Sequence, residues 1–399
     1  MMTQVMRFAW RTLAGLLTLP WRYRWTLTCL WLTRGWRRAW RYLVVKVLAR
    51  GERVGLQLLD PLALIGRTPY PYMLEIEHCT ACAVGCIHCE RQWFPEAWRN
   101  LTMSQEQLRR VLDQFPGLRY LGPTGEGSSF LNPAFPWLLD ECDRRGIYVL
   151  ATDSFAHLTG EQMGMLLRPC VGKVVISLDG ACASTYERVR RRASFRQTCD
   201  NIRTFFEWRQ RTGKPMPELS FRFVFFRDNW QDVEWFPDLV HRLLPEPQEG
   251  DDGFVEFMAL LEFEGTKDWV VELPPDVIER TEEKLHRYGL PHAWSHPSHL
   301  AERKRPMNQC AAYAEPYIMV DGSVVSCCAR MMSNRRDELR AAAFGNVFAQ
   351  DFRAIWDSPR YRAFRRAVPR GTQVPRSCVG CRAFRTEDRQ AHYGVDEAL

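Results

Sequence analysis

The stretch HCTACAVGCIHCER, residues 78–91, places four cysteines within eleven positions, directly after an expected strand at 72–78. The spacing is Cys-x2-Cys-x3-Cys-x2-Cys. Structural zinc sites use two Cys-x2-Cys pairs a dozen or more residues apart, and three intervening residues are too few for that arrangement. A bacterial ferredoxin orders its gaps differently and has proline where this chain has Glu90. A redox Cys-x-x-Cys pair would account for only two of the four thiols.

Strand and helix patterns alternate from residue 72 to residue 263, with a period of about thirty residues. The expected strands cover 72–78, 118–127, 147–154, 173–180, 219–226 and 253–263, and the expected helices cover 103–115, 133–146, 159–168, 195–213 and 230–244. Such alternation predicts an α/β fold with a parallel sheet or barrel. Chemistry in parallel barrels lies at the carboxyl ends of the strands. Residues 79–89, hereafter the cysteine loop, fall at such an end.

Charge is unevenly distributed along the chain. The net charge is +7, but residues 1–51 hold ten Lys and Arg and no acidic residue, which leaves 44 basic against 47 acidic residues elsewhere. The near-neutral body shows no general nucleic-acid footprint. Fourteen cysteines, clustered at ligand-like spacings, indicate a reducing compartment rather than a secreted disulfide scaffold. Without a cleavable signal pattern or a long uncharged apolar run, a cytoplasmic protein is expected.

Cys82, Cys86 and Cys89, read as Cys-x3-Cys-x2-Cys after the first strand, resemble the cluster motif of the radical S-adenosylmethionine superfamily. The resemblance implies a partial (β/α)6 barrel in which these cysteines hold a 4Fe–4S cluster with one open iron for S-adenosylmethionine. An electron then cleaves the cofactor to a 5′-deoxyadenosyl radical, which abstracts a substrate hydrogen. Because a fourth protein ligand would block the open iron, Cys79 is expected to be the one cysteine that does not bind.

Other expected strand ends resemble the same family, in order. The loop GPTGEGSSFLNP (122–133) lies where the family contacts the methionine amino group, and ISLDG (176–180) lies where it holds the ribose. TYERVR (185–190) ends in an arginine similar to the one near the cofactor carboxylate. A histidine before the last cysteine takes the place of a usual aromatic ring. The residues that this resemblance assigns to cofactor binding are His88, Gly125, Glu126, Ser177, Asp179 and Arg190.

A second group of cysteines lies toward the C-terminus and consists of Cys310, Cys327, Cys378 and Cys381. The segment YIMVDGSVVSCC (317–328) predicts a hairpin with Asp321-Gly322 as its turn. Together these features resemble the SPASM domain or the shorter twitch domain. The resemblance implies one auxiliary 4Fe–4S cluster on the four cysteines, with Cys327 a better ligand than Cys328. A zinc site is the alternative.

Four segments are expected: a basic, Trp- and Arg-rich helical arm (1–69), the partial barrel (70–265), a bridge (266–308) and a small C-terminal iron–sulfur domain (309–399). The bridge region holds four of the nine histidines, but Pro291 and Pro297 break any helix that would align them. A solvated linker is therefore expected there, with a metal site as the alternative. The arm, with six interleaved tryptophans, suits an interfacial helix on anionic lipid. Packing of the arm against the barrel is the alternative.

Besides Cys328, five cysteines lie outside both groups. Cys29, Cys142, Cys170 and Cys199 are in apolar or helical contexts and are expected to be core thiols. Cys182 follows ISLDG at the active end of a strand. A thiol there could return a hydrogen atom to a substrate radical, and a loop residue without a catalytic role is the alternative.

The sequence therefore predicts a radical S-adenosylmethionine oxidoreductase or modifying enzyme that acts on a membrane-proximal metabolite. A peptide or protein side-chain maturase of the same superfamily is the alternative. Outside that class, the alternatives are an iron–sulfur electron carrier and a zinc-stabilised binding protein. The expected partners are a flavodoxin or ferredoxin-type reductant and an unidentified substrate, with a peripheral contact on the inner face of the membrane and no nucleic acid.

Overall fold

The computed structural model describes residues 68, 70–212, 216–244, 253–261, 263, 265–295 and 315–370. The helical arm and four cysteines, namely Cys29, Cys310, Cys378 and Cys381, lie outside these residues, so what was expected of them stays a prediction. None of the helices within these ranges combines the length and the apolar character that a membrane crossing requires.

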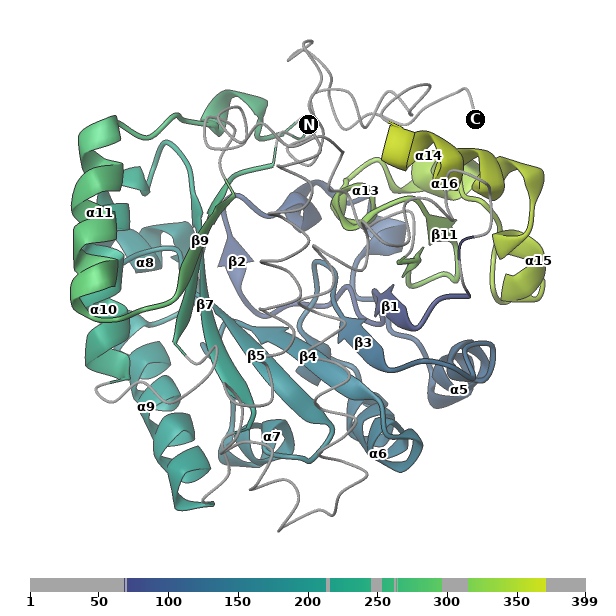
Figure 1. Ribbon diagram of the computed structural model, residues 1–399, viewed down its shortest axis with the longest axis horizontal. Helices are drawn as coiled ribbons and strands as arrows, with labels where there is room; N and C mark the ends of the chain where they lie inside the picture. Colours follow the sequence, from purple (N-terminus) through teal and green to yellow (C-terminus); the bar gives the residue numbers. More distant parts are fainter. Residues whose placement is uncertain are drawn as a thin grey trace, which may run out of the picture.

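A nine-stranded sheet in the order β11-β10-β1-β3-β4-β5-β7-β8-β9 forms the centre of the molecule (Figure 1). All six expected strands belong to it and pair in parallel with one another: β1 (Met73–Ile76), β3 (Tyr120–Pro123), β4 (Tyr148–Asp153), β5 (Val171–Ser177), β7 (Glu218–Phe225) and β8 (Phe254–Ala259). The predicted α/β class with a parallel sheet is confirmed. β11 and β9 are the two ends of the strand order, which suits a partial barrel.

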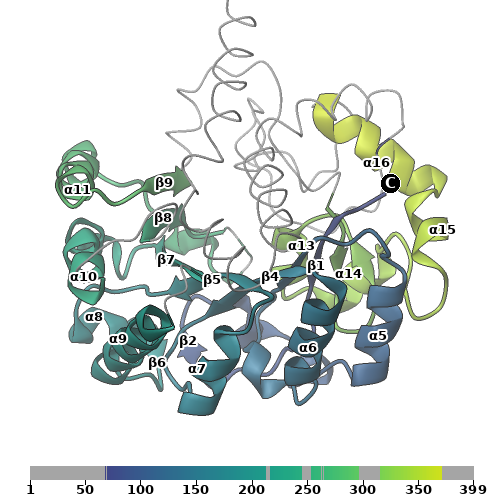
Figure 2. The same cartoon turned by 60° about the horizontal axis from the view of Figure 1, so that its bottom comes forward.

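The expected helices lie along the outer face of this sheet (Figure 2) and are α5 (Gln105–Asp113), α6 (Phe135–Arg145), α7 (Gly160–Leu166), α9 (Phe195–Arg211) and α10 (Phe236–Leu243). A shorter helix, α8 (Ala183–Val189), follows β5. The connections include 3-10 turns, η1 (Glu90–Trp93), η2 (Glu96–Trp98), η3 (Ser129–Leu131) and η4 (Trp230–Trp235). Local rules set helix starts: Ser104 and Gln107 form a reciprocal capping box at α5.

Residues 265–295 do not form the solvated linker expected in the bridge. They contain η5 (Lys267–Trp269), the helix α11 (Pro275–Arg287) and the strand β9 (His292–Ser295). β9 pairs in parallel with β8. The prediction of a linker is therefore wrong for this segment, which adds one more helix and strand to the barrel.

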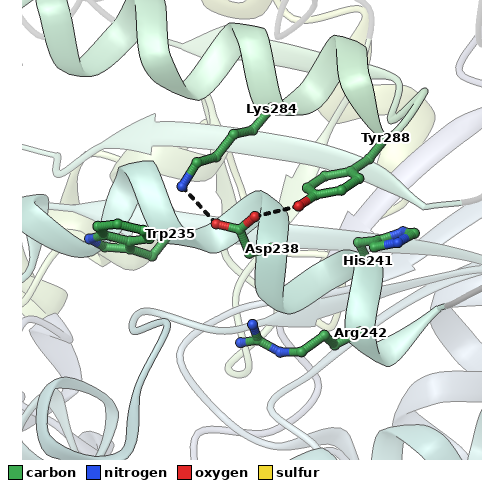
Figure 3. Close-up of a pocket in the computed structure, with 6 residues that line it drawn as sticks. All are labelled: Trp235, Asp238, His241, Arg242, Lys284 and Tyr288. Atoms are coloured by element: carbon green, nitrogen blue, oxygen red, sulfur yellow. Dashed lines mark hydrogen bonds and ion pairs between the residues drawn. The ribbon is translucent and has the colours of Figure 1, made fainter.

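Tertiary contacts hold this added repeat in place. Figure 3 shows the surface pocket between α10 and α11, where the Asp238 carboxylate lies 2.7 Å from Lys284 Nζ and 2.6 Å from the Tyr288 hydroxyl oxygen. On the strand, the Trp294 ring stacks on Phe257 with centroids 4.3 Å apart. Both contacts join residues far apart in the sequence, so no local pattern indicates them.

The described C-terminal residues continue the same sheet. β10 (Tyr317–Ile318) pairs in parallel with β1, and β11 (Val324–Val325) pairs antiparallel with β10, which confirms the expected hairpin. Gly322 in its turn has φ +87°, a left-handed conformation that glycine adopts without strain. The helices that follow are α13 (Cys328–Met332), α14 (Arg336–Ala341), α15 (Phe352–Trp356) and α16 (Pro359–Arg370).

A buried ion pair ties these helices to the barrel. Arg336 of α14 contacts the carboxylate of Glu77, which follows β1, and both side chains are fully buried. Glu77 also accepts a hydrogen bond from the Val320 amide at 3.2 Å. The Arg336 guanidinium lies 4.5 Å and 4.9 Å from the ring centroids of Phe94 and Trp98. Helix α14 is therefore fixed to the segment that leads into the cysteine loop.

His78 directly precedes the cysteine loop. Its ring is buried, and each ring nitrogen has a hydrogen-bond partner. Nε2 lies 3.0 Å from Ser129 Oγ, and Nδ1 lies 3.0 Å from Asn132 Nδ2. Because an amide nitrogen only donates, Nδ1 is the acceptor and the neutral ring carries its proton on Nε2. Burial lowers the pKa of His78 to about 4.

We expect His78 to weaken the fold in mild acid. The unfolded chain binds this proton near pH 6.5 and the folded chain only near pH 4, so stabilisation present above pH 6.5 is lost as the pH falls toward 4. Between pH 7 and pH 5 the free energy of unfolding should fall by about 2 kcal/mol through this group. Urea unfolding of wild type and His78→Gln at both pH values measures the effect. Equal pH dependence in the two proteins would contradict it.

Candidate metal centre

Three of the four thiols in the cysteine loop are partly exposed at the carboxyl end of β1. Cys82, Cys86 and Cys89 are half-buried, whereas Cys79 is only 2% exposed. The backbone of Cys79 bridges to Thr102, and its thiol lies 3.6 Å from the carbonyl oxygen of Ala81. The structure thus separates Cys79 from the three thiols that the family resemblance selects.

A short strand pair positions Cys86. β2 (Gly85–Cys86) pairs antiparallel with β6 (Arg190–Arg191), which places Arg190 directly opposite Cys86. Nη1 of Arg190 lies 3.7 Å from Cys86 Sγ. On the other side, a Cβ at Gly127 would lie 2.2 Å from the carbonyl oxygen of Cys79, so this position requires glycine. The cysteine loop is therefore held between two neighbouring segments.

The environment keeps these thiols protonated in the absence of a cation. Burial raises the pKa of Cys86 to about 12. Burial and the Glu126 carboxylate together raise the pKa of Cys89 well above its usual value, and Cys89 Sγ donates to Glu126 Oε2 at 2.5 Å. Thiolates form at such a site when a bound cation compensates their charge, and cysteine thiolates are the ligands of iron–sulfur clusters. The donor set of Cys82, Cys86 and Cys89 fits a 4Fe–4S cluster.

A site for a single metal ion would need several ligands close to one point. Within the ranges that the structure describes, no three His, Cys, Asp or Glu side chains converge on one metal ion. His286 and His292 of the bridge lie together, with ring centroids 5.6 Å apart, but they belong to no such group. In a 4Fe–4S cluster each thiolate binds a different iron, so the cysteines need not converge on one point.

Asp179 is the centre of a buried charged group beside the cysteine loop. Its side chain is fully buried, and Oδ2 lies 2.6 Å from Arg190 Nη2 and 3.4 Å from His88 Nε2. Oδ1 accepts from the Val224 amide at 2.9 Å, and Asn229 Nδ2 donates to the Asp179 carbonyl oxygen at 3.0 Å. Three predicted site residues are therefore brought together, and the Asp179 carboxylate is fully buried among protein atoms.

Burial and neighbouring charges shift the pKa values of Arg190 and His88 in this group. Burial lowers the pKa of Arg190, but Asp179, Cys86 and Tyr186 together raise it by more, so the net direction is upward. Burial lowers the pKa of His88 to about 4, so this ring is neutral at pH 7. The Nδ1 atom of His88 is buried with no hydrogen-bond partner among the described residues. It is a polar atom for which a bound group could supply the missing contact.

The glycine-rich loop reaches the cysteine loop through Gly125 and Glu126. Gly125 has φ +117°, and a Cβ there would lie 2.7 Å from Glu77 Cγ, so both its conformation and its space require glycine. This close approach places the Glu126 carboxylate within hydrogen-bond distance of Cys89 Sγ. Burial raises the pKa of Glu126. On β4, the Asp153 carboxylate accepts from Ser128 Oγ at 3.3 Å and joins this loop to the sheet.

Two predicted site residues stand apart from that group. Ser177 ends β5 and lies next to Arg222 of β7 in the strand register. Cys182 precedes α8 and is exposed, with its Sγ 3.2 Å from Ser184 Oγ and 3.6 Å from Asp232 Oδ2. The remaining described cysteines, Cys142, Cys170 and Cys199, are buried as expected of core thiols.

Sequence reasoning missed several residues that shape the site, namely Glu77, Arg222, Asn229 and Glu256. One signal was available for two of them. Arg222 lies between two phenylalanines in LSFRFVFF, and Glu256 lies within the apolar strand GFVEFMAL. A charge inside a buried apolar strand is costly unless it is paired or functional.

Of the predicted auxiliary ligands, only Cys327 lies in the described residues. It precedes α13, and Cys328 begins that helix, so the two adjacent thiols offer a matched test. We expect Cys327→Ala to remove about four irons per chain and Cys328→Ala to remove none, because one cluster needs one ligand from this turn. Iron analysis after anaerobic reconstitution measures both. The reverse result would assign the ligand to Cys328.

Comparisons with known proteins bear on the fold and on the C-terminal domain. Residues 310–382 match the family model of SPASM, an iron-sulfur cluster-binding domain. Streptococcus suis SuiB bound to precursor peptide SuiA shares 15% identity and a TM-score of 0.58, over 74% of this chain and 67% of that chain. SuiB bound to S-adenosylmethionine shares 16% identity and a TM-score of 0.58, over 74% and 68%.

The structure of anSMEcpe with bound AdoMet shares 15% identity and a TM-score of 0.50, over 74% of this chain and 82% of that chain. A search of curated protein sequences returns no significant match. At these identities the solved structures establish the fold, and the family model establishes the C-terminal domain. The chain thus has the fold of the radical S-adenosylmethionine enzymes and carries a SPASM iron–sulfur domain at residues 310–382.

Proposed function

We propose that this chain is a radical S-adenosylmethionine enzyme that oxidises or otherwise modifies its substrate. The observation that carries the proposal is the set of three partly exposed thiols, Cys82, Cys86 and Cys89, beside a buried Arg190–Asp179 pair at the carboxyl end of a parallel sheet. When bound, a 4Fe–4S cluster at this set would supply the electron that cleaves S-adenosylmethionine and so starts hydrogen abstraction from the substrate. An auxiliary cluster would occupy the SPASM domain.

Arg190 and Asp179 have complementary roles in this proposal. Arg190 places a positive charge 3.7 Å from Cys86 Sγ and thereby stabilises a thiolate there. Asp179, with its carboxylate fully buried, orients Arg190 and the neutral His88 ring. Asp179 is therefore a positioning residue rather than the ribose contact expected from the sequence. Ser177, at the end of β5, is left as the candidate for that contact.

When metal binds to Cys89, the Glu126 carboxylate becomes free to accept a different hydrogen bond. In the structure Cys89 donates its thiol proton to Glu126. A cysteine that ligates iron has lost that proton. The Glu126 carboxylate can then accept from an ammonium group, which is the contact that the resemblance gives this loop. Cys182 stays a candidate hydrogen donor on the strength of its exposed thiol at a strand's active end.

The test is anaerobic reconstitution of the full chain followed by reaction with S-adenosylmethionine and dithionite. We expect about eight irons per chain, four per cluster, and formation of 5′-deoxyadenosine. Two clusters without cofactor cleavage would favour an iron–sulfur electron carrier. Tightly bound zinc without iron would favour a zinc-stabilised binding protein. In the cell, a flavodoxin or ferredoxin-type protein would replace dithionite.

Two observations bear on the substrate, and they favour different classes. SuiB, whose fold this chain shares, has been solved with a precursor peptide, which supports the peptide alternative. The ten basic residues and six tryptophans within residues 1–51 support a membrane-proximal metabolite and a cytoplasmic protein docked peripherally on the membrane.

The arm's role can be measured directly. Each basic residue near an anionic surface contributes about 1 kcal/mol, so the full chain should sediment with phosphatidylserine-containing liposomes, and high salt should weaken the attachment. Neutral phosphatidylcholine liposomes are the control. Deletion of residues 1–51 should release the protein while iron content stays unchanged. A truncated chain that still sediments, or a full chain that ignores both liposomes, would contradict the membrane role.

A further inference from the structure

The inner face of the barrel sheet carries two partly exposed charged side chains, on β7 and β8. On β7, Phe221, Phe223 and Phe225 are fully buried beneath the outer helices. Arg222 points to the opposite face, and its side chain is 32% exposed although β7 has a neighbouring strand on each side. On β8, Glu256 is likewise 27% exposed. Alternation along a strand therefore directs two charged side chains into the interior space of the barrel.

Three polar inner-face residues form one row across adjacent strands. Ser177 of β5 is in register with Arg222 of β7, and Arg222 is in register with Glu256 of β8. Neighbouring strands lie about 4.8 Å apart, so the row is short enough for one small group to span. Arg222 Nε donates to Glu256 Oε2 at 2.8 Å. The row begins at the residue that the family resemblance assigns to the cofactor.

Most of the N–H donors of Arg222 make no hydrogen bond to the residues that the structure describes. Its hydrogen bond to Glu256 uses Nε, and within the described ranges neither Nη atom has a partner. An arginine carries five N–H donors, so four point elsewhere. Burial lowers the pKa of Arg222, but Glu256, Glu75 and Cys328 raise it, and the net direction is upward. Arg222 is therefore permanently charged, and its two Nη groups are available to donate hydrogen bonds.

From this arrangement we infer that Arg222 is the anchor of a substrate carboxylate, with Glu256 holding the guanidinium in position. An arginine fork matches a carboxylate in a bidentate geometry. A lipid acyl chain would be unfavourable at the same place, because it would remove water from the partly exposed Arg222 and Glu256 side chains without offering them a hydrogen-bond partner. The inference rests on the proposed function and selects its substrate class: a hydrophilic molecule with a carboxylate, either an acidic peptide side chain or a small organic acid.

The test uses full-length reconstituted protein and calorimetric titration with four probes. The probes are the blocked peptide acetyl-Ala-Glu-Ala-amide, its Gln counterpart, glutarate and laurate. We expect the Glu peptide or glutarate to bind, and the Gln peptide to bind at least about tenfold more weakly, because a charge-assisted hydrogen bond is lost. Tighter binding of the Glu peptide than of glutarate assigns a peptide source, and the opposite order assigns a small acid.

Variants separate recognition from folding. Arg222→Gln should weaken binding of the carboxylate probes about tenfold or more, and Arg222→Lys should restore part of it. Glu256→Gln should strengthen carboxylate binding, because the Gln oxygen can still accept from Arg222 Nε and hold the guanidinium while the competing negative charge is gone. A purely structural pair would lose binding in both variants. Arg203→Gln, on the outer helix α9, is the matched control and should bind as wild type does.

Two results would overturn the inference: equal binding of the Glu and Gln peptides, or preferential binding of laurate that is unaffected by Arg222→Gln. These titrations need no cofactor cleavage. Formation of 5′-deoxyadenosine by the wild-type protein is measured separately. Failure of the carboxylate site can therefore be told from failure of the proposed function.

Discussion

Replacing Cys82, Cys86 and Cys89 together by alanine is expected to abolish S-adenosylmethionine cleavage and to lower bound iron from about eight to about four per chain. The reason is the division of thiols in the structure, where these three are partly exposed on one loop. The predicted auxiliary ligands lie more than two hundred residues further along the chain and are untouched by the change. Iron analysis and chromatography of 5′-deoxyadenosine measure both effects.

Cys79→Ala is the matched control, because it removes a thiol from the same loop. Cys79 is buried and its thiol faces the Ala81 carbonyl, so its removal should leave iron content and cleavage near wild type. Loss of cleavage in Cys79→Ala, together with retention in Cys82→Ala, would show that the ligand register is shifted. Retention of eight irons in the triple variant would place both clusters elsewhere.

Replacing Arg336 by alanine should lower the free energy of unfolding by about 3–5 kcal/mol. The substitution leaves the Glu77 carboxylate fully buried without its counter-charge. It also removes the guanidinium that packs on Phe94 and Trp98. The loss is a large part of the 5–15 kcal/mol that typically holds a domain together. Urea unfolding at pH 8 measures it.

The pH dependence gives this prediction a second readout. Burial raises the pKa of Glu77 to about 7 from an ordinary value near 4.5, despite the opposing effect of Arg336. A raised pKa means that stabilisation present below pH 4.5 is lost as the pH rises through 7. Removing Arg336 takes away the group that lowers this pKa, so the destabilisation of Arg336→Ala should be smaller at pH 5 than at pH 8.

Two comparison variants make the interpretation specific. Arg340→Ala, on the same helix, breaks an exposed pair with Asp337 and should cost less than about 1 kcal/mol. The double variant Glu77→Leu with Arg336→Met replaces both charges with apolar groups and should recover most of the loss. If the double variant is no more stable than Arg336→Ala alone, the cost comes from packing rather than from an unpaired charge.

Much of the barrel was accessible from the sequence because its signals are local. Strands such as KVVISL and LSFRFVFF are short apolar runs between turn residues, and helices such as α5 begin at a local cap, here Ser104. The spacing of Cys82, Cys86 and Cys89 is equally local, since three ligands on one loop need no long-range contact. Such features depend on neighbouring residues and survive in any tertiary context.

Other features exist only through contacts between distant residues. β9 is four residues long and lies between prolines, and it is a strand because Val255–Met258 of β8 offers a parallel partner. Asp179 looks like a ligand at a strand end, yet the fold buries it against Arg190 and His88.

Glu77 and Arg336 show the same limit most clearly. They are 259 positions apart, and neither stands out in its own segment. The sequence by itself determined the α/β class, the succession of strands and helices along the chain and the spacing of the three cysteines, because these follow from residue periodicity and spacing. Only the tertiary structure decided which charged side chains share a buried environment, because burial and pairing depend on which surfaces the folded chain brings together.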